Sequence, residues 1–139
     1  MHIISSKPLS LATLRTLVFE GSDIVLSDEV VQKIQECRDY LDQKIASTSD
    51  PIYGINTGFG SLCDVRIHSE NLTKLQENLV RSHACGTGAL VPESIIKLML
   101  LLKIKSLSFG HSGVQLETVN RLVSFYNNDI LPVIYTQGS

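Results

Sequence analysis

"PIYGINTGFGSL", residues 51–62, sets Tyr53 directly in front of three glycines that fall within seven residues. Glycine-rich loops that bind phosphate follow GxxxxGK[ST] or GxGxxG and lead at once into a helix. The first pattern does not occur here, and Cys63 occupies the third glycine position of the second. The spacing therefore argues against a phosphate-binding loop.

From residue chemistry alone, Tyr53 has two interpretations. It is an ordinary half-buried aromatic residue in a glycine turn, or it is a catalytic group carried on a mobile loop over a cleft. A tyrosine side chain acts as a general base only when nearby positive charge or dipoles lower its pKa from about 10. Composition does not decide between these two interpretations.

The sequence before the loop predicts two helices. Ser10 is a candidate N-cap for a short helix that ends at Gly21, and residues 23–27 predict a brief extended segment. Ser27 precedes a second helix, which runs to about Ser47 and has negative charge in its first turn. The apolar residues of this second helix recur every three or four positions, as in an amphipathic helix: Val30, Ile34, Cys37, Leu41 and Ile45.

The sequence directly after the loop predicts a short strand and then a helix. Residues 63–67 form the candidate strand, and Ser69 with Glu70 begins the helix. We expect the helix to end at Gly86 in a left-handed cap. One stripe of this helix carries Leu72, Leu75, Leu79 and His83.

The last third of the sequence predicts two more helices and an extended tail. Residues 92–107 are apolar nearly all round, which is typical of a helix buried inside a larger protein. Gly110 and Gly113 interrupt the pattern, and the tail at 130–139 is extended in character because it contains a proline. The final helix ends at Asn127-Asn128 and uses Leu116, Val119, Leu122, Val123 and Tyr126.

Composition limits the classes of function. The 139 residues are about the length of one domain, and 43% of them are hydrophobic. The net charge is -2 with 12 Lys and Arg and no block of one sign, which excludes an ordinary nucleic-acid binder. The longest apolar run, 95–102, is far shorter than the roughly 20 residues of a membrane span. The first ten residues do not read as a signal peptide, so a cytoplasmic protein is expected.

The cysteines predict neither disulfides nor a metal site. Cys37, Cys63 and Cys85 are odd in number and widely spaced, which fits a reducing compartment. His83 and Cys85 are the nearest approach to a metal-binding pair, but a structural zinc ion needs four ligands. We therefore expect no metal.

Several segments in register carry a resemblance to a known family. Tyr53 to Gly60 resembles, apart from a variable aliphatic at Ile55, the tyrosine-loop signature of the aromatic amino acid ammonia-lyases. Segments 75–88, 100–114 and 130–139 resemble the family's next motifs in the same order. The similarity covers at least residues 52–139 and is greatest to the bacterial histidine ammonia-lyases of that family.

The resemblance implies a fold class and a place in a longer chain. The expected fold is mainly α: the N-terminal helical domain of the ammonia-lyase (fumarase/aspartase-like) fold, with a few short extended segments. Residues 1–139 would form the N-terminal domain segment of a larger lyase, ending just before the family's Ala-Ser-Gly triplet. Members of the family are homotetramers whose sites use more than one subunit, so this segment alone is expected to be inactive.

The resemblance also implies a reaction, the removal of ammonia from L-histidine to give trans-urocanate. The β-hydrogen is barely acidic and the amine leaves poorly, so both a base and an electrophile are needed. Tyr53 corresponds to the family's catalytic base. The electrophile is a methylidene-imidazolone that the family makes from its own Ala-Ser-Gly triplet, after a Gly-Ser pair that resembles Gly138-Ser139.

Ser82 and His83 bear on the choice of substrate. At the matching positions the resemblance implies Ser-His for histidine enzymes, Phe-Leu for phenylalanine enzymes and His-Leu for tyrosine enzymes. An imidazole at His83 can donate or accept a hydrogen bond to a substrate ring. The alternative is a core histidine whose ring is satisfied by a backbone carbonyl. Further substrate-binding candidates in the loop are Asn56, Phe59 and Gly60.

Two other functions stay open at this point. One is a tyrosine or phenylalanine lyase, or an aminomutase, of the same family. The other is a helical interaction module that retains the fold without the chemistry. The remaining histidines, His2, His68 and His111, are expected at the surface rather than in a site.

Overall fold

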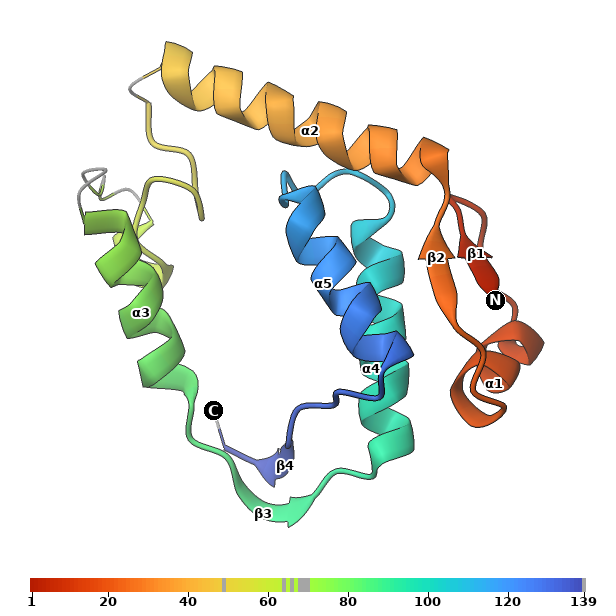
Figure 1. Cartoon of the computed structure of the whole chain (residues 1–139). Helices are drawn as coiled ribbons and strands as arrows, with labels where there is room; N and C mark the ends of the chain where they lie inside the picture. Colours follow the sequence, from red (N-terminus) through yellow and green to blue (C-terminus); the bar gives the residue numbers. More distant parts are fainter. Residues whose placement is uncertain (49, 64, 66, 68–70, 139) are drawn as a thin grey trace. The chain divides into compact units, whose positions relative to one another are not determined.

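The computed structural model describes residues 1–48, 50–63, 65, 67 and 71–138. Helices dominate the backbone, as the sequence predicts (Figure 1). The elements in chain order are β1 His2–Ile4, α1 Leu11–Phe19, β2 Ile24–Leu26, α2 Asp28–Ser47, the 3-10 turn η1 Gly60–Leu62, α3 Leu72–His83, β3 Thr87–Leu90, α4 Glu93–Leu107, α5 Leu116–Asn127 and β4 Tyr135–Gln137.

The chain divides into two compact units. The first, here called the core unit, contains Met1–Ala46 and Leu90–Ile134. The second, the loop unit, contains Ser47–Ala89 and Tyr135–Ser139. All the predicted site residues belong to the loop unit.

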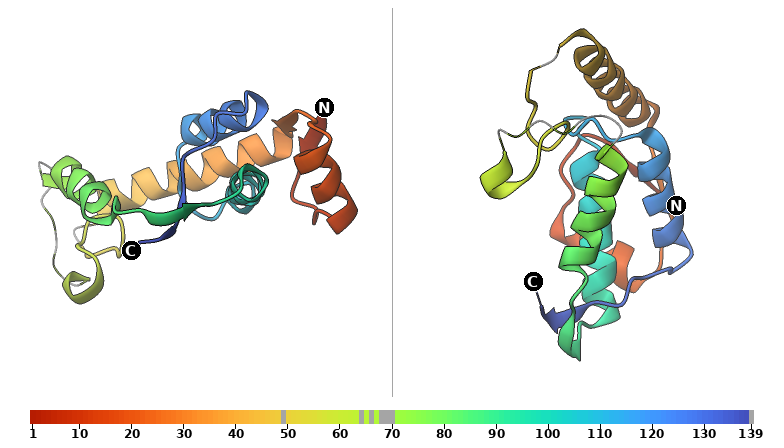
Figure 2. Two further views of the ribbon diagram at one scale, coloured as in Figure 1. Left: turned by 90° about the horizontal axis from the view of Figure 1, so that it is seen from below. Right: turned by 90° about the vertical axis from the view of Figure 1, so that its left-hand side faces the viewer.

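The core unit is built on the packing of α4 against α5, which lie side by side in Figures 1 and 2. Helix α1 packs on α4, and β2 contacts α5. Burying these apolar side chains supplies about 25 cal/mol for each Å² removed from water, which is the main stabilising contribution in such a cluster. The buried cluster comprises Ile4, Leu17, Ile24, Leu26, Val30, Ile34, Leu101, Ile104, Leu107, Val119 and Tyr126.

A small parallel sheet closes one side of this core. Strand β1 pairs with β2 in the register His2 to Ile24, and α1 forms the crossover between them. The Asn127 side chain ties the sheet to α5, because its Oδ1 accepts from the Ile24 N–H at 2.9 Å and its Nδ2 donates to the Ile24 carbonyl at 2.9 Å. Strand β2 was predicted as an extended segment, whereas β1 was not.

The predicted helix starts in the core unit are confirmed. Ser10 caps α1, with its hydroxyl accepting from the Thr13 N–H at 3.0 Å. The Ser27 hydroxyl accepts from the Val30 N–H at 3.3 Å at the start of α2. Such caps satisfy N–H groups that the helix itself leaves unpaired.

Helix α4 is buried on one face only within residues 1–139, and its apolar character extends beyond that face. Ile95, Met99 and Leu102 are each 44–51% exposed on one face, while the opposite face lies in the core. The buried face also contains Lys105, whose ammonium donates to the Ser5 carbonyl at 2.5 Å and lies 4.3 Å from the centre of the Phe109 ring. Burial lowers the pKa of Lys105.

The turn between α4 and α5 depends on glycine. Gly110 has φ +71°, and a Cβ there would lie 2.9 Å from the Lys33 carbonyl oxygen of α2. A side chain is disfavoured both by that backbone conformation and by the approach of α2. The predicted helix break at Gly110 is therefore confirmed, and the close approach explains why glycine is required.

The prediction that helix α3 ends at Gly86 in a left-handed cap is wrong. Helix α3 ends at His83 with Ala84 as its C-cap, and Gly86 is not among the described residues with positive φ. Its missing side chain instead admits Tyr135, because a Cβ at Gly86 would lie 2.6 Å from the Tyr135 ring. The predicted helix start at Ser69 and Glu70, and His68 itself, lie outside the described residues, as do parts of the candidate strand at 63–67.

Within the described part of the chain, no helix combines the length and the apolar character needed to cross a membrane.

Tyr126 is the largest fully buried side chain of the core unit, and its phenol donates to the Leu17 carbonyl at 2.7 Å. Burial, with smaller contributions from Asp129 and Asp23, raises its pKa to about 12. We expect Tyr126→Phe to lower the free energy of unfolding by about 1–3 kcal/mol at pH 8, because the Leu17 carbonyl loses a buried donor. Urea unfolding followed by circular dichroism measures this loss.

The pH dependence of the free energy of unfolding, compared between wild type and Tyr126→Phe, gives a second test. The pKa of Tyr126 in the folded protein exceeds the unfolded value of about 10. The free energy of unfolding that the buried neutral phenol contributes is therefore complete below pH 10 and is lost as the pH rises towards 12. At about 1.4 kcal/mol per pKa unit, the wild type should lose about 2–3 kcal/mol more than Tyr126→Phe over that interval. Tyr40→Phe, an exposed control, should follow the wild type. Parallel curves for wild type and Tyr126→Phe would contradict the assignment.

Candidate active site

Tyr53 stands at the second position of a tight turn. The Ile55 N–H donates to the Ile52 carbonyl at 3.0 Å, and Gly54 at the third position has φ +75°. Positive φ at the third position is a feature of type II turns and favours glycine or asparagine there. The glycine after Tyr53 is therefore explained by the turn that presents the tyrosine.

The phenol ring of Tyr53 projects from the turn and is 64% exposed. Its ring contact is with Phe59, at a centroid distance of 6.2 Å and an interplanar angle of 75°. This edge-to-face arrangement is favourable for two aromatic rings and restricts how the phenol can rotate. Gly60 follows with φ +58° and begins η1.

Asn56 lies under the turn and is only 8% exposed. Its Oδ1 accepts from the Ile52 N–H at 2.7 Å, and its Nδ2 donates to the Asp50 carbonyl at 3.1 Å. The neighbouring Thr57 is 1% exposed, and its hydroxyl donates to the Gly58 carbonyl at 3.0 Å. The loop that looked loose in sequence is thus held by buried polar contacts.

Ser82 and His83 occupy the last turn of α3, and both are exposed. Nδ1 of His83 lies 2.8 Å from the Leu79 carbonyl oxygen and 3.0 Å from the Ser82 hydroxyl. Because a carbonyl oxygen only accepts, Nδ1 carries a proton in this arrangement, and in the neutral ring Nε2 is then the acceptor. The Ser82 hydroxyl donates to the same carbonyl at 2.9 Å.

The segment beyond His83 is fixed by the tail of the chain, a feature that the sequence did not predict. Strands β3 and β4 form a two-stranded sheet (Figure 1). Tyr135 lies against Gly86, and a Cβ at Gly138 would lie 2.3 Å from the Cys85 carbonyl oxygen. The sequence signal for this pairing was limited to Gly86, Gly138 and Tyr135, which lie in or beside the two short extended segments. Neither segment has enough alternating apolar and polar residues to predict a strand.

The structure thus brings the predicted site residues together in two groups. Tyr53, Asn56, Phe59 and Gly60 share the turn and its continuation, whereas Ser82 and His83 share the end of α3. Among the contacts of the described residues, none joins the two groups. Tyr53, Gly60, Ser82 and His83 are exposed, whereas Phe59 is half-buried and Asn56 is buried.

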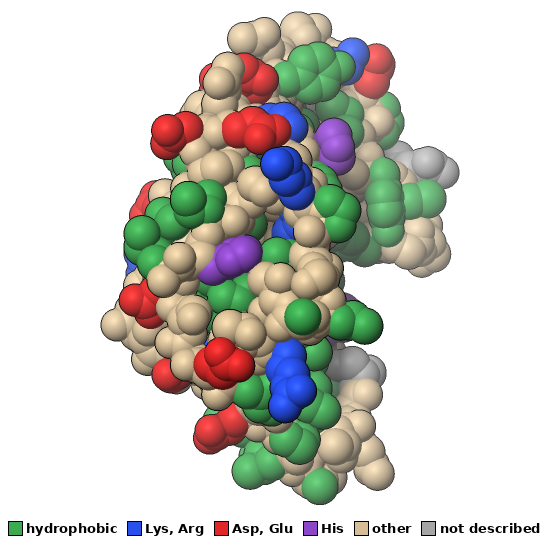
Figure 3. Space-filling view, turned by 90° about the vertical axis from the view of Figure 1, so that its right-hand side faces the viewer, with side chains coloured by type: hydrophobic (Ala, Val, Ile, Leu, Met, Phe, Trp, Pro, Cys, Tyr) green, Lys and Arg blue, Asp and Glu red, His purple; other side chains and the backbone are tan. Residues whose placement is uncertain are grey.

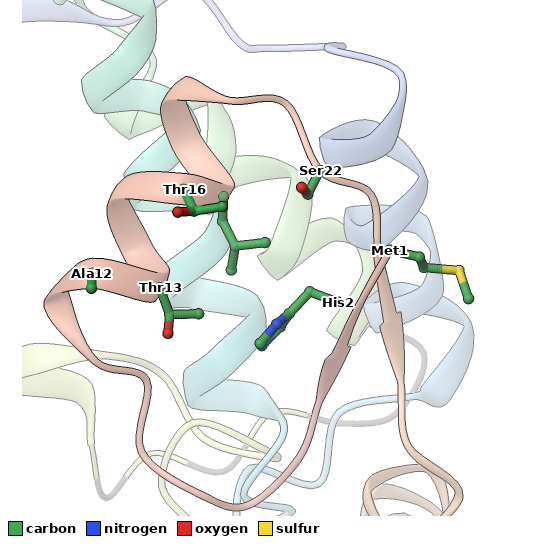
Figure 4. Close-up of a pocket in the computed structure, with 7 residues that line it drawn as sticks. Met1, His2, Ala12, Thr13, Thr16 and Ser22 are labelled. Atoms are coloured by element: carbon green, nitrogen blue, oxygen red, sulfur yellow. The ribbon is translucent and has the colours of Figure 1, made fainter.

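Cavities in the core unit are separate from these residues. One of about 400 Å³ is lined by Met1, His2, residues of α1 and Ser22 (Figure 4). The hydroxyls that α1 contributes to it are already engaged, Thr13 with Ser10 at 2.8 Å and Thr16 with Glu20 at 3.5 Å. A second cavity, of about 440 Å³, borders the ion pair between Lys97 and Asp129. Neither arrangement resembles a reactive centre.

The charged and metal-ligating side chains of the described residues are dispersed. They contain no group of three or more His, Cys, Asp or Glu side chains placed to hold a metal ion. The face shown in Figure 3 carries acidic and basic side chains interspersed, without a broad patch of one sign.

The sequence of this chain matches a known protein family. A model described as aromatic amino acid lyase matches residues 9–139. The chain is 41% identical over 137 residues to the histidine ammonia-lyase of Legionella pneumophila (strain Lens), covering 99% of this chain and 27% of that protein. The chain thus spans about a quarter of the length of the curated relatives it matches.

Solved structures agree in fold. The histidine ammonia-lyase of Trypanosoma cruzi is 35% identical with a TM-score of 0.83, over 99% of this chain and 27% of that one. The tyrosine aminomutase of Streptomyces globisporus is 30% identical with a TM-score of 0.88, over 99% and 26%. The predicted fold class is confirmed by these matches, and with the family model they show that this chain belongs to the aromatic amino acid lyase family.

Proposed function

We propose that this chain is the N-terminal part of a histidine ammonia-lyase, which eliminates ammonia from L-histidine to give trans-urocanate. The observation that carries the proposal is the exposed phenol of Tyr53 at the apex of a turn whose backbone is fixed from beneath. A catalytic base needs both access to substrate and a defined position. The Tyr53 turn provides both, and the relatives named above include histidine ammonia-lyases.

Tyr53 is proposed to remove the β-proton of the substrate. Its contact with Phe59 holds the ring at the edge of the turn, so the hydroxyl is available on the exposed side of the loop unit. A 1 Å displacement of such a group can lower the rate by about 10²-fold. A turn held by backbone hydrogen bonds therefore suits this role better than a freely moving loop.

His83 is proposed to bind the substrate ring. With Nδ1 bonded to Leu79, the neutral imidazole offers Nε2 as an acceptor for an N–H donor. The imidazole of L-histidine carries such a donor, whereas the ring of phenylalanine does not. Ser82 contributes to the orientation of His83, because its hydroxyl lies 3.0 Å from Nδ1.

The amine still requires an electrophile, which a methylidene-imidazolone would supply. Residues 1–139 contain no Ala-Ser-Gly triplet, so that group would come from sequence outside them. The exposed positions of Tyr53 and His83 are compatible with a site completed by other parts of the chain or by other subunits. We propose a homotetramer, in keeping with the resemblance.

The test uses the full-length protein that contains this segment. Purified enzyme should convert L-histidine to trans-urocanate and leave L-tyrosine and L-phenylalanine almost unconverted. Formation of coumarate, cinnamate or a β-amino acid in place of urocanate would support the tyrosine or phenylalanine lyase, or an aminomutase like the relative from Streptomyces globisporus. Absence of turnover on all three amino acids would favour the non-catalytic module.

A further inference from the structure

We infer that Asn56 is a positioning residue that fixes the turn carrying Tyr53, and not a group that binds substrate. The inference rests on the proposed function of Tyr53. It departs from the interpretation of Asn56 as a substrate-binding residue, and its basis is the hydrogen bonding of a side chain that is 8% exposed.

Asn56 binds both backbone polar groups of Ile52. Its Oδ1 accepts from the Ile52 N–H at 2.7 Å, and its own backbone N–H donates to the Ile52 carbonyl at 3.2 Å. These two bonds close a ring around the three residues between them, Tyr53 to Ile55. The Tyr53 backbone is therefore confined at both ends by one residue.

The other end of the amide extends the clamp to the chain before the turn. Nδ2 of Asn56 donates to the Asp50 carbonyl at 3.1 Å. The segment entering the turn is thus attached to the same side chain that closes it. Each atom of the amide thus already bonds a backbone group. At 8% exposure the side chain offers a substrate little access to its second Nδ2 hydrogen.

Backbone contacts then connect the clamp to the rest of the loop unit. The Asn56 carbonyl accepts from the Ile67 N–H at 2.8 Å, and the Gly58 N–H donates to the Val65 carbonyl at 3.0 Å. The exposed Tyr53 phenol is therefore supported through Asn56 by a second stretch of chain. Losing the amide would free the turn and so misplace the phenol, while leaving the phenol group chemically intact.

The test compares Asn56→Ala and Asn56→Asp in the full-length enzyme. Asn56→Ala should lower kcat about 10-fold and change KM for L-histidine much less, because it misplaces Tyr53 without removing a contact to substrate. Asn56→Asp keeps the acceptor for the Ile52 N–H and loses the donor to the Asp50 carbonyl. Its kcat should therefore fall between those of the wild type and Asn56→Ala. Asn120→Ala, the same change at an exposed position of α5, should behave as wild type.

Hydrogen exchange provides a readout that does not depend on turnover. Amides of residues 52–56 should exchange about 10-fold faster in Asn56→Ala, with α3 unchanged, since removing one net hydrogen bond corresponds to about that factor. A rise in KM with unaltered exchange would overturn the inference and make Asn56 a substrate contact. If the wild type shows no lyase activity, the proposed function fails, yet exchange still tests the clamp. If Asn56→Ala does not fold, Asn56→Asp carries both measurements.

Discussion

Tyr53→Phe is expected to lower kcat for ammonia elimination by about 10²- to 10⁴-fold in the full-length enzyme, the range usual for loss of a general base. The substitution removes one hydroxyl from a side chain that is 64% exposed. It keeps the ring that contacts Phe59 and the turn that Gly54 and Asn56 form. The loss should therefore appear in the chemical step, measured as the steady-state rate of trans-urocanate formation, while KM changes little.

Two controls separate catalysis from folding in this experiment. The melting temperature of Tyr53→Phe should equal that of the wild type, because no described hydrogen bond of the core unit or of the turn involves the Tyr53 phenol. Tyr40→Phe removes a hydroxyl from a tyrosine that is 68% exposed on α2 and should retain full activity. If Tyr53→Phe kept wild-type kcat, the proton would have to be removed by another group.

The helices of the core unit could be predicted because their signals are local. Ser10 and Ser27 place caps within three residues of the groups they satisfy, and Gly21 and Gly110 follow the ends of α1 and α4. The short pairing of β1 with β2 was partly missed, since three residues show no useful alternation. The side chain that ties β2 to α5, Asn127, lies over a hundred positions from Ile24. Contacts at such separations carry no local pattern.

Two other differences have the same origin. From the sequence no role was assigned to Lys105, yet it lies buried because Ser5 supplies a carbonyl and Phe109 a ring. Gly86 was read as a helix cap, yet its role is to admit Tyr135. In both cases a deciding partner, Ser5 for Lys105 and Tyr135 for Gly86, comes from a distant segment that no local pattern indicates.

For the candidate site, the sequence selected the residues and the structure supplies their relations. The motif around Tyr53 could be recognised, but a glycine-rich loop reads as flexible until the bonds of Asn56 are known. Similarly, His83 could be identified as a ring-binding candidate, while the proton on Nδ1 follows only from its distance to Leu79. The chemistry of a side chain is local, whereas its hydrogen-bonding state depends on its neighbours.

His83→Leu is expected to lower kcat/KM for L-histidine by about 10²-fold in the full-length enzyme, the upper range for loss of one hydrogen bond involving a charged or strongly polar group. The leucine removes the Nε2 acceptor and leaves an apolar surface at the end of α3. The same variant should discriminate less against L-phenylalanine, whose ring needs no acceptor. Competition between the two amino acids, with both products quantified, measures the ratio directly.

Matched variants decide whether this effect belongs to hydrogen bonding. His83→Gln retains a donor and an acceptor at the end of α3 and should recover part of the activity on L-histidine that His83→Leu loses. Ser82→Ala should cost less than His83→Leu, because the Leu79 carbonyl still holds Nδ1 at 2.8 Å. His111→Leu, a change at an exposed histidine in the turn after α4, should leave both substrates unaffected. Equal losses on L-histidine and L-phenylalanine in His83→Leu would indicate a structural role at the helix end, and the substrate assignment would then have to rest on residues outside this segment.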